Sequence, residues 1–276
     1  MLINCESAHV LLEYDLHSKA MVQQMMKYQK EGNPMYRIHT FIVEELPQIH
    51  GELKYKSQFY QIYHHDGIYE QKQYNEQQEV MGVIVYQGNL ASIYLTREHI
   101  GTKEYLLTEY ATVYFLLKNR DLIFIHGSSF LYQNHGVLLI ADSGVGKSTH
   151  SGLWREYESI TMVNDDKNYI GYKDGKLMLY GNPWSGKYLL DSNMEAPLTD
   201  LVYIYRGTEN KIQGLSKKQS FLSLLPHVAT TSFFLQKEVW DKMTTLLVEK
   251  TNSYALYCNI SKEAVETLKH ALEENK

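Results

Sequence analysis

One segment near the middle of the chain has the residues of a phosphate-binding loop. Positions 141–149 read Ala-Asp-Ser-Gly-Val-Gly-Lys-Ser-Thr, which fits the pattern G-x-x-x-x-G-K-[ST] except that Ala141 replaces the first glycine. In such a loop the backbone N–H groups point inward around an anion, and the two glycines allow the dihedral angles that this requires. The lysine reaches the β- and γ-phosphates, and the hydroxyl after it ligates Mg²⁺. The motif therefore predicts a nucleotide-binding site made by Ser143, Gly144, Val145, Gly146, Lys147, Ser148 and Thr149.

The segments on either side of this loop favour the same interpretation. Residues 137–140 are an apolar run of strand length directly before it, and a helix is expected after it, to about Trp154. The N-terminal end of that helix would add a partial positive charge to the site. A glycine-rich turn with an incidental lysine is the alternative, and the order of strand, loop and helix argues against it.

A pair of carboxylates, Asp165-Asp166, follows the next expected strand at residues 160–164. If this strand runs parallel to the one before the phosphate loop, both carboxylates lie beside that loop. Phosphoryl transfer needs such groups, because one holds Mg²⁺ and the other accepts a proton from the attacking hydroxyl. A solvated pair in a turn is the alternative, and the presence of the phosphate loop favours the functional interpretation.

Two further side chains are candidates for the same site. His126 follows an expected strand at residues 122–125, and taken alone it would be assigned a structural role. Residues 181–187 read Gly-Asn-Pro-Trp-Ser-Gly-Lys and imitate a second phosphate loop, but Pro183 lacks an N–H and Trp184 is bulky. We therefore expect a rigid loop that carries Lys187 towards the site.

Composition and charge exclude several classes of protein. The 276 residues are 44% apolar and 21% charged, which is an ordinary globular balance. A net charge of −5 gives no electrostatic reason to bind nucleic acid or an anionic membrane. The two cysteines, Cys5 and Cys258, form neither a metal motif nor a disulfide framework. The N-terminus lacks the features of a signal peptide and no apolar stretch reaches about 18 residues, so we expect a cytoplasmic protein.

The patterns predict a strand-rich N-terminal region at residues 1–100 and a nucleotide-binding core at residues 101–276. Turn signals at Asp66-Gly67 and at residues 87–89 each separate two apolar runs and predict hairpins, as does Asp174-Gly175. His64 and His65 are adjacent and point to opposite faces of a strand, which makes them poor ligands for one metal ion. A helical period is expected at 103–118, and the chain is expected to turn helical after residue 205, with apolar faces at 239–247 and 265–272.

Three features taken together resemble the catalytic core of HPr kinase/phosphorylase: Ile125-His126-Gly127, residues 136–149 and Val163-Asn164-Asp165-Asp166. In that family a His-Gly pair precedes a G-[DE]-S-G-x-G-K-S loop and then an Asp-Asp pair. The order is similar in the ATP-dependent phosphoenolpyruvate carboxykinases. The resemblance implies an α/β, β-rich fold, with a phosphoenolpyruvate carboxykinase-like P-loop core, N-terminal β-hairpins packed on it and helices at the C-terminus.

The resemblance also implies roles for individual residues. Ser148 and Asp166 would serve the metal, while Asp165 would be the base towards a serine hydroxyl, and the two Asp roles are exchangeable. His126 would lie near the γ-phosphate or the metal. Cations for the transferring phosphoryl group would come from Lys187 and Arg206.

The implied activity is a kinase that uses ATP, or another nucleoside triphosphate, with Mg²⁺ or Mn²⁺ and transfers the γ-phosphoryl group to a hydroxyl, such as a serine of a peptide or small protein. Thr149-His150 replaces the Glu-containing helix start that is typical of HPr kinases, so the acceptor need not be HPr. A kinase of small-molecule alcohols and a non-catalytic module that senses ATP stay open as alternatives. The chain is shorter than a carboxykinase, and a homo-oligomer is compatible with the sequence.

Overall fold

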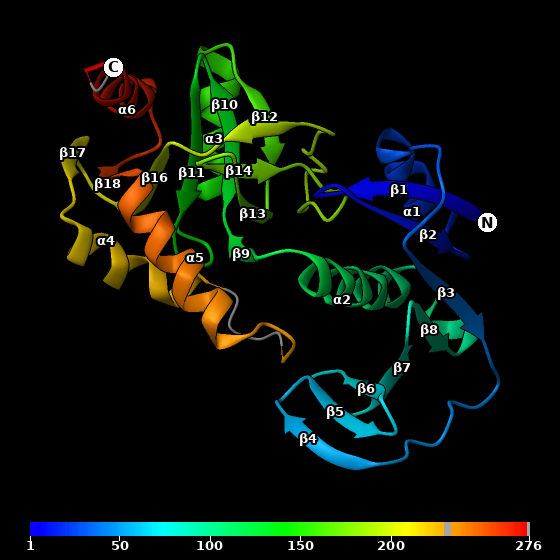
Figure 1. The fold of residues 1–276 in the computed structure, drawn as a ribbon. Coiled ribbons are helices and arrows are strands. Elements are labelled where there is room, and N and C mark those ends of the chain that lie inside the picture. The colour runs from blue at the N-terminus through cyan, green and yellow to red at the C-terminus, as the bar shows by residue number, and fades with distance from the viewer. Residues whose placement is uncertain (229–232, 275–276) are drawn as a thin grey trace. The chain divides into compact units, whose positions relative to one another are not determined.

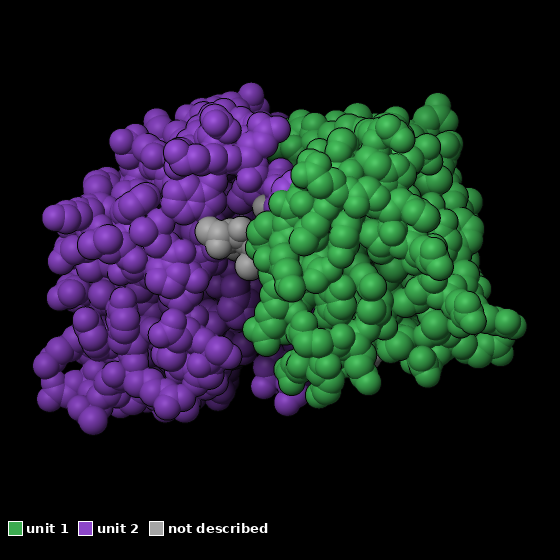
Figure 2. Space-filling model, turned by 90° about the horizontal axis from the view of Figure 1, so that it is seen from below, with its two compact units in different colours: residues 1–120 green, residues 121–276 purple. Residues whose placement is uncertain are grey.

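The computed structural model of the chain describes residues 1–228 and 233–274, and these form three β-sheets and six α-helices (Figure 1). The chain divides into two units, residues 1–120 and residues 121–276, which are coloured separately in Figure 2. Within the described residues, no helix has both the length and the apolar character needed to cross a membrane.

The first unit is built on an eight-stranded sheet with the order β1-β2-β3-β8-β7-β6-β5-β4. Its strands are β1 (Leu2–Ser7), β2 (Val10–Asp15), β3 (Tyr36–Ile42), β4 (Glu52–Lys56), β5 (Tyr60–His65), β6 (Ile68–Tyr74), β7 (Val80–Gln87) and β8 (Leu90–Leu95), and its helices are α1 (Lys19–Met25) and α2 (Thr102–Asn119). The antiparallel pairs β5–β6 and β7–β8 confirm the two predicted hairpins. In β2 every second side chain is buried, as expected for a strand with one face on a core.

Helix α2 belongs to the first unit. It confirms the helical period predicted at 103–118, and it packs against β7, β8 and β3. The boundary between the units therefore follows this helix, whereas the sequence patterns predict a boundary before it, at residue 100. Hydrophobic periodicity identified the helix, but it did not indicate which sheet the helix covers.

The second unit contains two sheets, of six and four strands, with the orders β12-β10-β11-β16-β18-β17 and β15-β14-β13-β9. Its strands are β9 (Leu122–His126), β10 (Ser128–Tyr132), β11 (His135–Ile140), β12 (Thr161–Asn164), β13 (Lys167–Lys173), β14 (Lys176–Tyr180), β15 (Glu195–Pro197), β16 (Asp200–Arg206), β17 (Lys211–Gly214) and β18 (Asn252–Cys258). Its helices are α3 (Lys147–Tyr157), α4 (Lys217–Leu224), α5 (Lys237–Lys250) and α6 (Lys262–Glu274). The predicted hairpin about Asp174-Gly175 is confirmed as β13–β14.

The expectation that the chain turns helical after residue 205 is wrong for β17 and β18. Strand β18 lies between α5 and α6 and pairs in parallel with β16. Most of its side chains are buried on both faces, so it shows no alternation of apolar and polar residues. A short apolar run of this kind cannot be distinguished from part of a helix by its periodicity.

The direction of the strands brings two predicted motifs to one edge of the six-stranded sheet. Strand β10 pairs antiparallel with both β11 and β12, so β11 and β12 run in the same direction. Their carboxyl ends, which carry the phosphate loop and the Asp pair, therefore point to the same edge. The parallel direction was expected, but the structure inserts β10 between the two strands.

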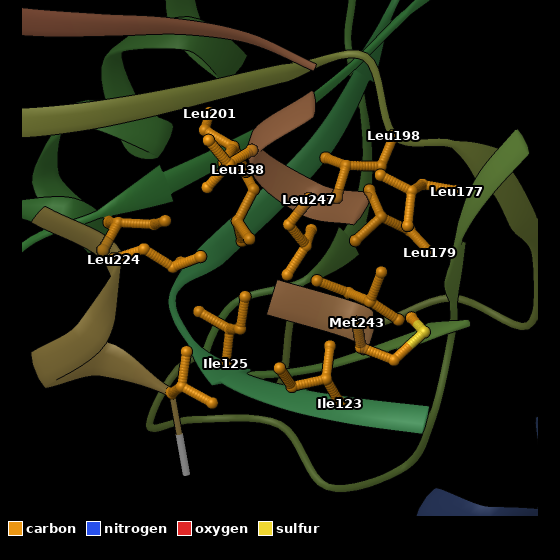
Figure 3. Close-up of a cluster of buried hydrophobic side chains, with 14 of the residues drawn as sticks. Ile123, Ile125, Leu138, Leu177, Leu179, Leu198, Leu201, Leu224, Met243 and Leu247 are labelled. Carbon is orange, nitrogen blue, oxygen red and sulfur yellow. The ribbon is translucent and has the colours of Figure 1, made fainter. Parts of the chain in front are cut away.

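Helices cover both faces of this six-stranded sheet. Alternate residues of β11 and β16 belong to two different apolar clusters, which shows that the clusters lie on opposite faces. Helices α4 and α5 contribute to the first cluster, together with side chains of the four-stranded sheet (Figure 3). Helices α3 and α6 contribute to the second, through Trp154 and the predicted apolar face of Val265, Leu268 and Leu272. The phosphate loop thus begins at the end of β11, a strand with a layer of helices on each of its two faces.

Candidate active site

The phosphate loop joins β11 to α3, which confirms the predicted order of strand, loop and helix. Gly144 has a φ of +76° and Gly146 a φ of +132°, in the region that favours glycine, and nothing lies within 4 Å of where a Cβ would be placed at either residue. The buried Nζ of Lys147 donates to the carbonyl oxygen of Ala141 at 2.7 Å. This contact ties the start of α3 to the end of β11, and it gives the loop a closed shape with open space in front of the glycines.

The hydroxyl side chains of the loop remain accessible. Ser143, Ser148 and Thr149 are all exposed. Ser148 stands in the first turn of α3, where the helix N-terminus presents a partial positive charge. The predicted phosphate-binding residues thus occupy the loop and the first turn of α3, and their hydroxyl groups are open to a ligand.

A buried asparagine holds the Asp pair in a tight turn at the end of β12. The side-chain oxygen of Asn164, which is 0% exposed, accepts hydrogen bonds from the N–H groups of Asp166 at 2.9 Å and of Lys167 at 2.8 Å. As a result, the two neighbouring carboxylates lie in different surroundings. Asp165 is buried, at 5% exposure, and Asp166 is partly open to solvent.

His126 is the direct partner of Asp166. Its Nδ1 lies 2.8 Å from Oδ1 of Asp166, and the next residue, Gly127, donates its N–H to the carbonyl oxygen of Asp166 at 2.9 Å. The pairing of β9 with β13, in which His126 faces Lys167, sets this approach. Burial by itself raises the pKa of Asp166, but the hydrogen bond and charge of His126, with the charges of Lys167 and Lys147, lower the pKa below its ordinary value. Asp166 is therefore held as a carboxylate.

Asp165 faces the loop that follows β14. The N–H of Gly186 donates to its Oδ1 at 2.6 Å, while its Oδ2 is buried and has no hydrogen-bond partner among the described residues. Burial and the charge of Asp166 raise the pKa of Asp165, although the N–H groups of Gly186, Leu190 and Tyr188 act in the other direction. The Asp pair thus consists of one carboxylate that stays ionised and one that binds a proton more readily.

The phosphate loop and the Asp pair form one electrostatic unit. Burial lowers the pKa of the Lys147 ammonium, and the negative charges of Asp166 and Asp142 oppose this shift. The charge of Lys147 in turn helps to lower the pKa of Asp166. The structure therefore brings together His126, Lys147, Asp165 and Asp166, as the sequence predicted.

Arg206 and Lys187, the two cations expected to serve the phosphoryl group, lie in different surroundings. The guanidinium of Arg206 hydrogen-bonds the carbonyl oxygens of Gly144 and Val145, and Arg206 lines both of the hollows that adjoin the phosphate loop. Lys187 is exposed, and its ammonium lies 5.9 Å from the ring centre of Tyr188. The loop that precedes Lys187 does reach the site, but it does so through the backbone of Gly186.

Several residues of the site gave no signal in the sequence. Asn182 is 0% exposed, and its side-chain amide donates to the carbonyl oxygen of Lys167 at 2.8 Å. Its backbone and side-chain oxygen atoms both accept hydrogen bonds from the side-chain amide of Asn164.

His227 lies at the end of a short 3₁₀ segment that follows α4, 3.9 Å from Asp142. It lines a hollow of 310 Å³ beside the phosphate loop. Burial lowers the pKa of His227, and the nearby charges of Lys147 and His126 contribute in the same direction.

The residues present fit a divalent ion that is bound together with a nucleotide. Among residues 1–228 and 233–274, no group of three or more His, Cys, Asp or Glu side chains could hold a metal by itself. Mg²⁺ needs fewer protein ligands, because it is usually bound by one or two carboxylates, water and the phosphates of a substrate. Asp166 is ionised and partly open, and the Ser148 hydroxyl is exposed, so these two groups have the chemistry required.

Comparison with known proteins finds a distant likeness at the level of structure. No model of a protein family matches the chain, and no curated protein matches it. A solved structure that does match is described as the structure of the Hpr(Ser) kinase/phosphatase from Coxiella burnetii, and it is 9% identical over 55% of this chain and 93% of that chain. The TM-score is 0.33, and a likeness at this level carries no conclusion about what this chain binds or does.

Proposed function

We propose that the chain is a Mg²⁺-dependent kinase that transfers the γ-phosphoryl group of ATP to a hydroxyl. One observation carries the proposal: the buried ammonium of Lys147, in a glycine-containing anion loop, shares its electrostatic surroundings with the ionised Asp166. A lysine in such a loop serves the β- and γ-phosphates, and a carboxylate beside it serves the metal that these phosphates carry. A loop that only binds a structural anion has no need of this carboxylate.

The metal, when bound, neutralises charge that develops on the transferring phosphoryl group. Asp166 and Ser148 are its protein ligands in this proposal, and His126 orients the carboxylate of Asp166 through the 2.8 Å contact. The backbone N–H groups of the loop and the ammonium of Lys147 hold the phosphates in line for attack.

Asp165 is the proposed base for the acceptor hydroxyl. Its pKa is raised by burial, which makes it a better proton acceptor than an ordinary surface carboxylate. Its Oδ2 is the oxygen that lacks a partner in the described structure, and it is therefore the atom that would receive the proton.

The proposed acceptor is a serine of a peptide or small protein, and an alcohol of low molecular weight is the alternative. Incubation of the full chain with γ-labelled ATP, Mg²⁺ and either serine-containing peptides or small polyols separates these two classes. Labelled peptide supports the first acceptor class, and labelled polyol supports the second. Binding of ATP without transfer to any hydroxyl would instead favour a nucleotide-sensing module.

Two variants test the assigned roles. Asp165→Asn is expected to lower the rate of transfer by about a hundredfold or more while ATP binding stays nearly unchanged, because the base acts only on the acceptor. Lys147→Ala is expected to weaken both ATP binding and transfer. Transfer at the normal rate by Asp165→Asn would show that the assigned base is wrong.

A further inference from the structure

A cleft adjoins the phosphate loop on the side where the loop enters α3. It has a volume of 420 Å³ and lies between the loop, the first turns of α3 and the segments that follow β16 and β18. Its apolar lining comes from Val145, Leu153, Ile204 and Ile260. The volume falls in the range of small-molecule sites, roughly 300–1,000 Å³, and such sites are lined mainly by apolar side chains.

The topology of the sheet places this cleft where α/β proteins bind ligands. Strands β11, β16 and β18 are neighbours and all run in parallel. The phosphate loop, residues 207–210 and residues 259–261 therefore follow the carboxyl ends of three adjacent strands. Ligands of open α/β sheets bind in crevices outside these ends.

The two hollows beside the loop differ in their chemistry, and this difference sets the direction of the nucleotide. The 310 Å³ hollow contains Asp142 and His227, and His227 is close enough to His126 to respond to its charge. It is therefore on the side of the reacting phosphoryl group. The 420 Å³ cleft, among the described residues, is lined by no carboxylate, and it borders Thr149 at the opposite end of the loop.

We propose that this cleft binds the nucleoside of the phosphoryl donor, with the face of the base against Ile260 and Leu153. The assignment rests on the proposed function for the choice of a nucleotide as ligand. Ile260 is 76% exposed, an unusual position for a large apolar side chain beside a cleft. A base that covers it removes apolar surface from water, and this favours binding.

The wall that carries Ile260 is held in place by hydrogen bonds before any ligand arrives. The N–H of Gly207 donates to the carbonyl oxygen of Cys258 at 3.0 Å, which joins the segments after β16 and β18. Asn210 adds two contacts: its oxygen accepts from the N–H of Asn259 at 3.1 Å, and its amide donates to the hydroxyl of Ser261 at 3.2 Å. A preorganised wall of this kind loses little conformational freedom when a ligand binds.

The test compares a ligand that has a nucleoside with one that lacks it. Calorimetric titration of the full chain with ADP, and separately with inorganic pyrophosphate, is carried out in the presence of Mg²⁺ for the parent chain and for Ile260→Asp. The substitution is expected to weaken ADP binding by about tenfold or more and to weaken pyrophosphate binding much less, because the new negative charge repels both anions whereas the loss of the apolar wall affects only the nucleoside. Leu222→Asp is the matched control, since Leu222 is 57% exposed on α4 and does not line the cleft.

Two results would overturn the assignment. One is an Ile260→Asp variant that binds ADP as tightly as the parent chain does. The other is a parent chain that binds ADP no more tightly than pyrophosphate, since the nucleoside would then add nothing. The proposed kinase activity fails by a different observation, the absence of phosphoryl transfer, and a nucleotide sensor without transfer would still show the effect of Ile260→Asp on ADP binding.

Discussion

His126 is the last residue of β9 and Asp166 directly precedes the paired strand β13, with Nδ1 of the imidazole 2.8 Å from Oδ1 of the carboxylate. A carboxylate only accepts hydrogen bonds, so Nδ1 carries the proton in this contact and Nε2 is the nitrogen left for other partners. The pair keeps Asp166 ionised and fixes its orientation. This is the arrangement that a metal-binding carboxylate requires.

Replacement of His126 by alanine is expected to weaken the productive binding of Mg²⁺. Loss of an orienting partner of this kind typically costs about 10- to 100-fold in metal affinity or activity. The measurement is the dependence of the transfer rate on Mg²⁺ concentration, in which saturation should require more metal. His270→Ala is a suitable control, because His270 also faces a carboxylate, Glu274 at 3.3 Å, but is 74% exposed on its side chain. If the two variants require the same Mg²⁺ concentration for saturation, His126 does not orient the metal-binding carboxylate.

Gly186 lies against the side chains of both aspartates, so the addition of one methyl group tests their position. A Cβ at this residue would lie 3.1 Å from Cβ of Asp166 and 3.4 Å from both carboxylate oxygens of Asp165. Gly186→Ala is therefore expected to displace the Asp pair and to lower kcat by about tenfold or more, while nucleotide binding changes little. In the control Gly214→Ala, nothing lies within 4 Å of the added carbon, and kcat should not change. A normal kcat in Gly186→Ala would contradict the assigned position of the pair.

The chemistry of the site was predictable to the extent that it depends on short motifs. The phosphate loop, the Asp pair and His126 each carry a local signature, and the structure brings His126, Lys147, Asp165 and Asp166 together. Strands β11 and β12 also run parallel, which is the condition under which the sequence placed the Asp pair beside the phosphate loop. The connection through α3 favours this direction.

The contacts that hold these groups were not predictable, because they depend on residues that come together only in the fold. Asn164 and Asn182 are ordinary loop residues in the sequence, yet each is fully buried and hydrogen-bonded to the other. The role expected of Lys187 required the loop at residues 181–187 to direct this side chain towards the Asp pair. In the structure the group of this loop that contacts Asp165 is the backbone N–H of Gly186. For β18, burial on both faces removed the alternation that would have distinguished a strand from a helix.

Asn164 should be important for stability as well as for the site. In Asn164→Ala the N–H groups of Asp166 and Lys167 lose their acceptor, and the buried side chain of Asn182 loses a donor. Unsatisfied polar groups cost about 1–3 kcal/mol each when buried, and since these are partly buried we expect a loss of about 2 kcal/mol in the free energy of unfolding. Urea denaturation measures this quantity. A variant as stable as the parent chain would mean that water replaces the asparagine at no cost.

His150 is expected to make stability depend on pH. It is 3% exposed in α3, where its Nε2 accepts a hydrogen bond from the indole N–H of Trp154 at 3.3 Å, and burial lowers the pKa of His150 to about 4 from the ordinary 6.5. Between these two values the unfolded chain binds the proton more readily than the folded chain does. The contribution of His150 to stability is therefore present above pH 6.5 and is lost as the pH falls towards 4.

The expected size of this effect is about 2 kcal/mol in the free energy of unfolding between pH 7 and pH 5, after other titrating groups are subtracted. The variant His150→Gln provides that subtraction, because glutamine retains an oxygen that can accept from Trp154 and has no titrating group. Urea denaturation of both proteins at the two pH values gives the difference. If the parent chain and His150→Gln lose stability equally on acidification, the imidazole of His150 is not the group that responds to pH, and the acid sensitivity of the fold must then come from other groups, such as the carboxylates or His227, whose pKa burial also lowers.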